Sequence, residues 1–237
     1  MKAVLKSIAH RVRRTLRPAA GDAETRLEPV SRSFGFERGT PIDRYYIEKF
    51  LTGKTGLIKG RALEVGEATY LKKLGRDVSS EWILVPDKAV LKSADSNGQV
   101  VVGDITGTLT DDQGFDCFIC TQTLNVVYDT TAAVRNAYDL LRPGGWFLGT
   151  VPGISQISRY DMDRWGDYWR FTSKAVERML TDVFGARPQV EIYGNLYSSK
   201  AFLDGLALED LNDRSVLDHT DSDYQLIIGF AAQRVAP

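Results

Sequence analysis

The sequence has little of what would set it apart from ordinary globular proteins. It contains only two cysteines in 237 residues, and its formal net charge is −1 at pH 7. Two cysteines cannot build a disulfide framework, which favours a reducing compartment. A net charge near zero disfavours nucleic acid as the partner, because proteins that bind nucleic acid usually carry a basic domain or face. No run of 18 or more apolar residues occurs, so the sequence predicts no membrane-spanning helix.

Length and composition predict one packed domain. A chain of 237 residues can form one well-buried α/β domain with appendages but is too short for two domains of the usual size. Hydrophobic residues make up 43% and charged residues 26%, which is the range of globular proteins. We expect residues 1–33 to form an arm and linker, and residues 34–237 to form the domain.

The two cysteines have the spacing of a redox or metal motif. Cys117 and Cys120 read C-x-x-C, but no second pair is present to complete a zinc site. They fall in a predicted strand, where residues three apart point to opposite faces. The pattern therefore favours packing of both thiols in the core.

The amino-terminal segment is basic and amphipathic. Residues 1–17 contain no acid, and their apolar residues recur near helical spacing. Such a helix can bind an anionic membrane or a protein partner, and a solvated helical arm is the alternative. The apolar region and cleavage site of a signal peptide are missing. The predicted location is cytoplasmic, with attachment to the inner face of the membrane through the arm as an alternative.

Apolar strands and helical stretches alternate along the domain. Repeated alternation of this kind predicts an α/β fold, with a parallel sheet and helices on both faces. The predicted strands are residues 62–65, 82–85, 100–102, 115–120, 146–151, 190–193 and 224–232. The predicted helices are residues 42–51, 69–74, 131–141, 173–183 and 199–206.

Ligands of the nucleotide type bind such sheets beyond the carboxyl ends of the strands. Gly66 follows the first predicted strand and allows the backbone to turn tightly and approach a ligand; a plain strand-to-helix turn is the alternative. Glu81, at the second strand, is a candidate to accept hydrogen bonds from ribose hydroxyls. Its neighbour Trp82 is a candidate to stack on adenine. A solvated acid beside a core tryptophan is the alternative for this pair.

The third and fourth strands end in further candidates. Asp104 can accept a hydrogen bond from the amine of adenine, while Ile105 covers the ring. The fourth strand runs into Thr121 and Gln122, which are polar and suit the methionine part of a cofactor.

Together these segments resemble the class I S-adenosylmethionine-dependent methyltransferases, in particular the methyltransferase type 11-like proteins. Residues 141–145, Leu-Arg-Pro-Gly-Gly, introduce the fifth strand as in that group. The resemblance implies a Rossmann-like sheet of seven strands, mostly parallel with an antiparallel last strand. It implies S-adenosylmethionine as the cofactor and methyl transfer to an oxygen, nitrogen or carbon acceptor. The cofactor contacts that it implies are Glu64, Gly66, Glu81, Asp104 and residues 121–124.

The first motif departs from the family pattern. The family usually has acid-x-Gly-x-Gly-x-Gly, whereas this chain has Glu64, Gly66, Ala68 and Tyr70 at those positions. Ala68 is a small change, but Tyr70 adds bulk near the start of a helix. The departure predicts either a loop that bends differently or a weaker affinity for the cofactor.

Residues 151–172 follow the fifth strand and mix aromatic rings with acids and arginines. This mixture suits a sugar or another polar acceptor, because rings stack on apolar faces while charged groups bind hydroxyls. Arg164, Trp169 and Arg170 are the candidate substrate contacts. Alternatively, Trp169 wedges the loop onto the sheet and Arg170 pairs with an acid. The run at residues 167–172 resembles that of methyltransferase-like proteins associated with bacterial surface polysaccharide synthesis.

Methyl transfer from a sulfonium depends mainly on alignment, because the leaving group is already activated. A hydroxyl acceptor would also gain from a base within hydrogen-bond reach. Tyr160, Asp161 and Asp163 are the candidates. The two aspartates could instead bind a divalent cation, but we expect no metal.

Three functions fit the sequence in decreasing order. The first is a methyltransferase that acts on a sugar, a glycan or a related small polar molecule. The second is a non-catalytic methyltransferase-like domain that binds a partner through the basic arm or the aromatic loop. The third is a nicotinamide-dependent sugar-modifying enzyme, which is disfavoured because no Gly-x-Gly-x-x-Gly follows the first strand.

Overall fold

The computed structural model describes residues 27–87, 99–107, 109 and 114–235. In these residues, seven strands form one sheet in the order β3-β2-β1-β4-β5-β7-β6. The strands are β1 (Gly60–Val65), β2 (Val78–Val85), β3 (Gln99–Val102), β4 (Phe115–Thr121), β5 (Leu141–Pro152), β6 (Gln189–Tyr193) and β7 (Ile227–Gln233).

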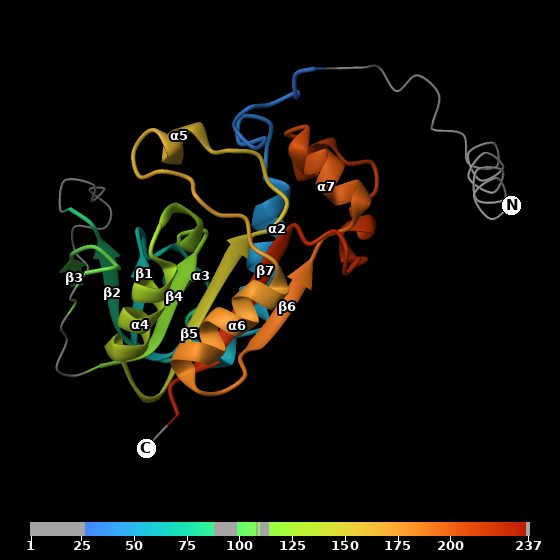
Figure 1. The fold of residues 1–237 in the computed structure, drawn as a ribbon. Coiled ribbons are helices and arrows are strands. Elements are labelled where there is room, and N and C mark those ends of the chain that lie inside the picture. The colour runs from blue at the N-terminus through green and yellow to red at the C-terminus, as the bar shows by residue number, and fades with distance from the viewer. Residues whose placement is uncertain (1–26, 88–98, 108, 110–113, 236–237) are drawn as a thin grey trace, which may run out of the picture.

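The direction of the strands confirms the predicted fold class. Strands β1 to β5 pair in parallel, and β7 runs antiparallel to both β5 and β6. The carboxyl ends of the parallel strands therefore meet at one edge of the sheet, the upper edge in Figure 1. This edge is where an α/β sheet of this kind binds its ligands.

Helices cover both faces of the sheet, as the near-continuous apolar strands require. On one face, α2 (Ile42–Thr52) and α3 (Thr69–Leu74) contribute to one buried cluster. On the other, α4 (Thr130–Leu140) and α6 (Ser173–Phe184) contribute to a second. The two cysteines of β4 lie on opposite faces, Cys117 in the first cluster and Cys120 in the second. Both thiols are buried, and burial raises the pKa of Cys120 to about 12. Both cysteines therefore pack as core residues.

The ends of the helices follow ordinary capping chemistry. The side chains of Asp129 and Thr172 accept hydrogen bonds from the first turns of α4 and α6, which satisfies N–H groups that have no partner inside the helix. The helix α6 ends at Gly185, whose φ of 70° is left-handed and therefore suits glycine.

Several boundaries differ from the prediction; the second and fifth strands, for example, start earlier, at Val78 and Leu141. The helix expected at residues 199–206 is α7 (Leu196–Leu203), because Asn195 and Ser198 form a capping box that starts it earlier. The last strand starts at Ile227 rather than at residue 224.

The described part of the expected linker lies against the domain. The backbone N–H groups of Val30 and Ser31 donate to the carbonyl of Asp204, at 2.8 and 3.2 Å. The predicted amphipathic helix at residues 1–17 lies outside the described residues. Of the helices in the described ranges, none has the length and apolar content needed to cross a membrane.

Candidate active site

The first strand ends in an open turn at the ligand edge. Gly66 has a φ of 85°, which favours glycine. A Cβ built at this position would have no atom within 4 Å. The backbone of Gly66 is thus exposed to open space beyond β1, as a site that a ligand approaches closely requires.

Glu64 holds this turn in place. Its buried carboxylate accepts hydrogen bonds from the backbone N–H groups of Tyr70 and Leu71, at 2.9 to 3.1 Å. Glu64 therefore ties the first turn of α3 to β1, and its predicted contact with the cofactor stays a prediction.

Tyr70, the largest departure from the glycine motif, turns into the core. Its side chain is 6% exposed and packs in the cluster of α2 and α3. The charge of Arg44 on α2 acts on its hydroxyl. The bulk of the tyrosine therefore occupies the interior of the protein and leaves the open side of Gly66 unobstructed.

The structure corrects the expected positions of Glu81 and Trp82. Glu81 lies in the body of β2 opposite Ala62, not at the carboxyl end. Trp82 pairs with the first residue of β3, and Arg61 lies over its ring at 4.3 Å. Since parallel strands all run the same way, both side chains lie away from the ligand edge.

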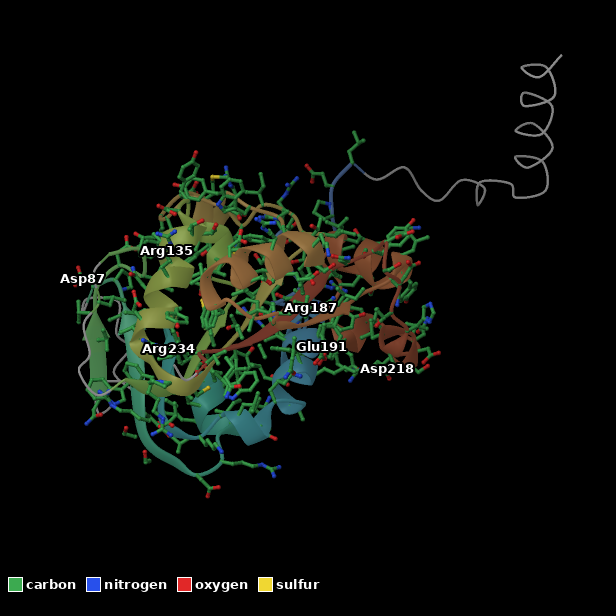
Figure 2. The ribbon with its side chains drawn as sticks, turned by 60° about the horizontal axis from the view of Figure 1, so that its bottom comes forward. Asp87, Arg135, Arg187, Glu191, Asp218 and Arg234 are labelled. Carbon is green, nitrogen blue, oxygen red and sulfur yellow. The ribbon has the colours of Figure 1, made fainter. Side chains whose placement is uncertain are left out.

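The acid that follows the end of β2 is Asp87, which the sequence analysis passed over. Figure 2 shows it at the β3 side of the molecule, far from Glu191 and Asp218. Asp104 follows β3, is exposed, and accepts hydrogen bonds from the N–H and hydroxyl of Thr106 at 2.8 Å. Ile105 is buried beneath it. The ends of β2 and β3 thus each present one carboxylate near the ligand edge.

Thr121 and Gln122 lie where the prediction placed them, at the end of β4. Gln122 has a left-handed φ of 49°, a strained conformation for a residue with a side chain. Its N–H donates to the carbonyl of Thr150 at 2.8 Å, and its amide donates to the hydroxyl of Thr150 at 3.1 Å. These bonds hold Gln122 at the end of β4, where it lines a cavity.

A cavity of about 530 Å³ lies at the same edge of the sheet. Its walls come from the segment before α2, the first turn of α2, the ends of β4 and β5, α5 (Arg159–Met162), and α7. The apolar residues of the lining are Phe34, Phe36, Pro152, Phe202 and Ile227. The uncharged polar residues are Ser33, Gln122, Asn125, Ser155, Gln156, Ser158 and Tyr160, and the charged ones are Arg32, Asp43, Arg44, Arg159, Asp161, Asp167 and Arg170.

The loop between β5 and α6 forms one wall and passes over the ligand edge (Figure 1). Asp167 holds it together, because its carboxylate accepts two hydrogen bonds from Arg170 at 2.6 and 2.7 Å. The N–H of Ser158 donates to the same carboxylate at 2.9 Å. Burial alone would raise the pKa of Asp167, but the bonds and charge of Arg170 and the bond from Ser158 hold the pKa below its ordinary value.

The predicted catalytic and substrate residues of this loop separate into two groups. Tyr160, Asp161 and Arg170 line the cavity. Asp163 does not; it is exposed and lies 4.0 Å from Arg159.

Two of the predicted substrate contacts also lie outside the cavity lining. The guanidinium carbon of Arg164 lies 3.7 Å from the centre of the exposed Tyr160 ring. The indole N–H of Trp169 donates to the carbonyl of Val127 at 3.0 Å. Trp169 therefore fastens the loop to the segment after β4, as the structural alternative had it.

Most of the cavity lining was not predicted from the sequence, and three of its polar residues matter for the chemistry. Asn125 is 7% exposed, and its Oδ1 is buried without a hydrogen-bond partner among the described residues. Asp43 and Arg44 belong to the first turn of α2, 78 residues or more before Gln122 and the polar residues of the loop wall. Only the folded chain brings them to the site; an acid at a helix start carries no such signal.

The described ranges contain no group of three or more His, Cys, Asp or Glu side chains arranged to hold a metal ion.

Comparison with known protein families finds a match to part of the sequence. The family model described as a methyltransferase domain matches residues 56–149, which run from before β1 to within β5. This match confirms the resemblance of the segment to the methyltransferase domains. No curated protein matches the sequence.

Solved structures of low sequence identity share the fold. A chain of the Haloferax volcanii complex between the methyltransferase activator Trm112 and a putative methyltransferase is 13% identical, with a TM-score of 0.55 over 82% of this chain and 92% of that one. A Thermotoga maritima methyltransferase, described as a possible histamine N-methyltransferase, is 15% identical, with a TM-score of 0.54 over 81% and 91%. The N-methyltransferase NodS of Bradyrhizobium japonicum with S-adenosylhomocysteine is 13% identical, with a TM-score of 0.52 over 86% and 93%.

Proposed function

We propose that the protein transfers a methyl group from S-adenosylmethionine to a hydroxyl of a small polar acceptor, a sugar or the end of a glycan. The observation that carries the proposal is the cavity of about 530 Å³ at the ligand edge of the sheet. Gln122 lines this cavity and follows β4, the strand that pairs with β1 and so lies beside the Gly66 turn. A cofactor at the turn and an acceptor in the cavity would therefore be neighbours.

The residues at the strand ends fit the cofactor. The space over Gly66 accepts the close approach of a ligand to the backbone, and Tyr70 does not fill it. We assign the ribose contact to Asp87, in place of Glu81, and the adenine contact to Asp104 with Ile105. Thr121 and Gln122 would contact the methionine part. When bound, the cofactor supplies a methyl group on a positively charged sulfur, which is a good leaving group.

The lining of the cavity supports a hydroxyl-rich acceptor. Phe34 and Phe202 offer rings, stacked at 5.7 Å, while Asn125 presents an amide oxygen that lacks a donor. A buried acceptor without a donor is costly, so a ligand that brings an O–H group there would be favoured. Aromatic faces together with a few polar groups are typical of sugar sites.

The test is methyl transfer measured with radiolabelled cofactor against a panel of methyl glycosides, amino sugars and short oligosaccharides. We expect a hydroxyl-bearing sugar to accept the label, and we expect Asn125→Leu to raise its KM at least tenfold with little change in cofactor affinity. Binding of S-adenosylhomocysteine is measured beside it by calorimetry. No binding of this product up to millimolar concentration would reject a methyltransferase function altogether.

One observation favours a second candidate, a domain that binds a partner without catalysis. Three exposed rings lie in the loop between β5 and α6 and in the segment after β4. They are Tyr168 and Trp165 of the loop, 49% and 43% exposed, and Tyr128 of the segment, 70% exposed. The ring centroids of Tyr128 and Tyr168 lie 5.3 Å apart. Rings of this kind are enriched at protein interfaces. Absent cofactor binding, together with loss of a stable complex in Tyr128→Ser, would support this candidate instead.

A further inference from the structure

A second carboxylate of the cavity, Asp43, lies opposite the aromatic loop. It is the second residue of α2, is 8% exposed and forms part of the cavity lining. The sequence had predicted a helix at residues 42–51 but no functional residue in it. The position of Asp43 thus brings a carboxylate from the far side of the fold to the space where the acceptor would bind.

The protein does little to compensate this buried charge. Its Oδ1 accepts one hydrogen bond, from the backbone N–H of Arg44 at 2.8 Å, and no ion pair within 4.0 Å involves Asp43 among the described residues. The guanidinium of Arg44 acts on it only at longer range and is also coupled electrostatically to Tyr70. Burial therefore dominates, and it raises the pKa of Asp43 above its ordinary value.

A buried carboxylate without a counter-ion lowers stability. When such a group lines a cavity, the cost is most simply explained by a role in binding or proton transfer. We propose that Asp43 is the general base of the reaction and takes the proton from the acceptor hydroxyl. This inference rests on the proposed function, because it requires an acceptor with a proton to lose.

The step balances without any further reactant. The acceptor O–H bond breaks and its proton passes to the free oxygen of Asp43, while the acceptor oxygen forms a bond to the methyl carbon. The carbon–sulfur bond breaks, and its electron pair stays on sulfur. Asp43 afterwards releases the proton to water, which restores the carboxylate.

The other carboxylates of the cavity are less suited to this step. Asp167 is bound by Arg170 and Ser158, which lower its pKa and occupy its oxygens. Asp161 is half-buried on the rim, next to the exposed ring of Tyr160. A base works best when its pKa is raised toward the working pH, and of these three only Asp43 is both buried and without a strong donor.

The groups that act on Asp43 come from two packed elements. Arg44 on its own helix favours the charged carboxylate, and Tyr70 on α3 is coupled electrostatically to both residues. Arg32, Arg159 and Arg170 line the same cavity, so the pH dependence of Asp43 has to be measured in the whole folded chain.

The first experiment needs no acceptor. Side-chain carboxyl carbons of the full chain are labelled and titrated by NMR, and Asp43→Asn identifies the resonance. We expect Asp43 to titrate above the ordinary aspartate pKa of 3.8. Titration at or below that value would overturn the proposal, whatever the acceptor turns out to be.

The second experiment uses the labelled methyl glycosides of the acceptor panel. Asp43→Asn is expected to lower kcat about 100-fold or more, the usual range for loss of a general base, with the affinity for S-adenosylhomocysteine retained. The acidic limb of the pH profile should disappear in this variant. Asp182→Asn, an exposed aspartate on α6, is the matched control and should keep the activity of the original protein.

Two results would count against Asp43 in this assay. One is a kcat within threefold of the original protein in Asp43→Asn; the other is a loss of the acidic limb in Asp161→Asn instead. Asp43→Glu guards against misfolding, because it keeps a carboxylate in the cavity and should recover part of kcat. If no glycoside is methylated although the cofactor binds, the acceptor class fails while the NMR titration still decides the state of Asp43.

Discussion

Two walls of the same cavity hold a buried aspartate each, in opposite electrostatic settings. Asp167 on the loop wall and Asp43 on the helix wall are both 8% exposed. Asp167 has an arginine fork and a backbone donor, and its pKa is lowered. Asp43 has one backbone donor, and its pKa is raised by burial. The loop wall is built for rigidity, and the helix wall keeps a reactive carboxylate at a cost in stability.

The largest effect is expected from breaking the loop wall. Asp167→Ala leaves the half-buried guanidinium of Arg170 without its partner, which should cost about 3 kcal/mol in the free energy of unfolding. Urea unfolding at pH 7 measures it. Asp163→Ala, which removes an exposed ion pair at 4.0 Å, is the control and should change stability by no more than about 0.5 kcal/mol. Equal losses in the two variants would contradict the ranking.

The same two walls should respond to pH with opposite sign. Asp167 has a folded pKa below its ordinary 3.8, so its contribution is present above pH 3.8 and is lost as the pH falls through the folded pKa. Asp43 has a folded pKa above 3.8, so its ionisation lowers the stability of the fold as the pH rises from 3.8 through the folded pKa. Asp43→Asn should therefore be more stable than the original protein at neutral pH, by less than the loss in Asp167→Ala, and the gain should vanish in acid. A loss of stability at pH 7 would contradict the uncompensated charge.

A third comparison concerns the two acids of β2. Asp87→Ala should weaken S-adenosylhomocysteine about tenfold, or roughly 1.4 kcal/mol, because it removes the carboxylate that follows the strand. Glu81→Ala, in the body of β2, should leave the affinity within about twofold. Isothermal calorimetry with both variants checks this, and a reversed order would restore the assignment made from the sequence.

The error at Glu81 has a plain physical cause. It was selected by its spacing from Gly66, while the strand was predicted to start one residue later. A carboxylate before a parallel strand lies at the amino edge, opposite the ligand. The true strand also starts earlier, at Val78, because Val78, Ser80 and Glu81 pair with β1 although residues 79–81 are polar. Side-chain spacing alone could not show which edge they occupy.

Most of the fold was predictable for a different reason. Buried parallel strands contain short apolar runs, and β4, β5 and the part of β2 after Glu81 all contain one. The open turn at Gly66 and the cavity-lining loop followed from their positions after strands. Asp43 and Asn125 were not predictable, because a helix start and a short segment after β4 gain their role only when the fold brings them to one cavity.

The bulk of Tyr70 illustrates the same limit of prediction from sequence. Its hydroxyl is expected to contribute less to stability than the carboxylate of Asp167. The sequence motif predicts interference with the cofactor, whereas the structure turns the ring into the core and its hydroxyl toward Arg44. Tyr70→Phe should lose about 1 kcal/mol of stability with the affinity for S-adenosylhomocysteine unchanged, measured by urea unfolding and calorimetry. A tighter affinity for S-adenosylhomocysteine in Tyr70→Phe would show that the hydroxyl does reach the space over the Gly66 turn.

The smallest effect belongs to the outer side of the loop wall. Trp169→Phe removes the indole N–H that donates to the carbonyl of Val127 but keeps an aromatic ring beside Tyr128. Because Trp169 is 38% exposed and water can replace the lost donor, stability should fall by about 0.5 kcal/mol. The KM for a glycoside acceptor should not change, since the ring is not part of the cavity lining. A KM raised severalfold with unchanged stability would instead make Trp169 a substrate contact, and the cavity would then extend further over the loop than its lining indicates.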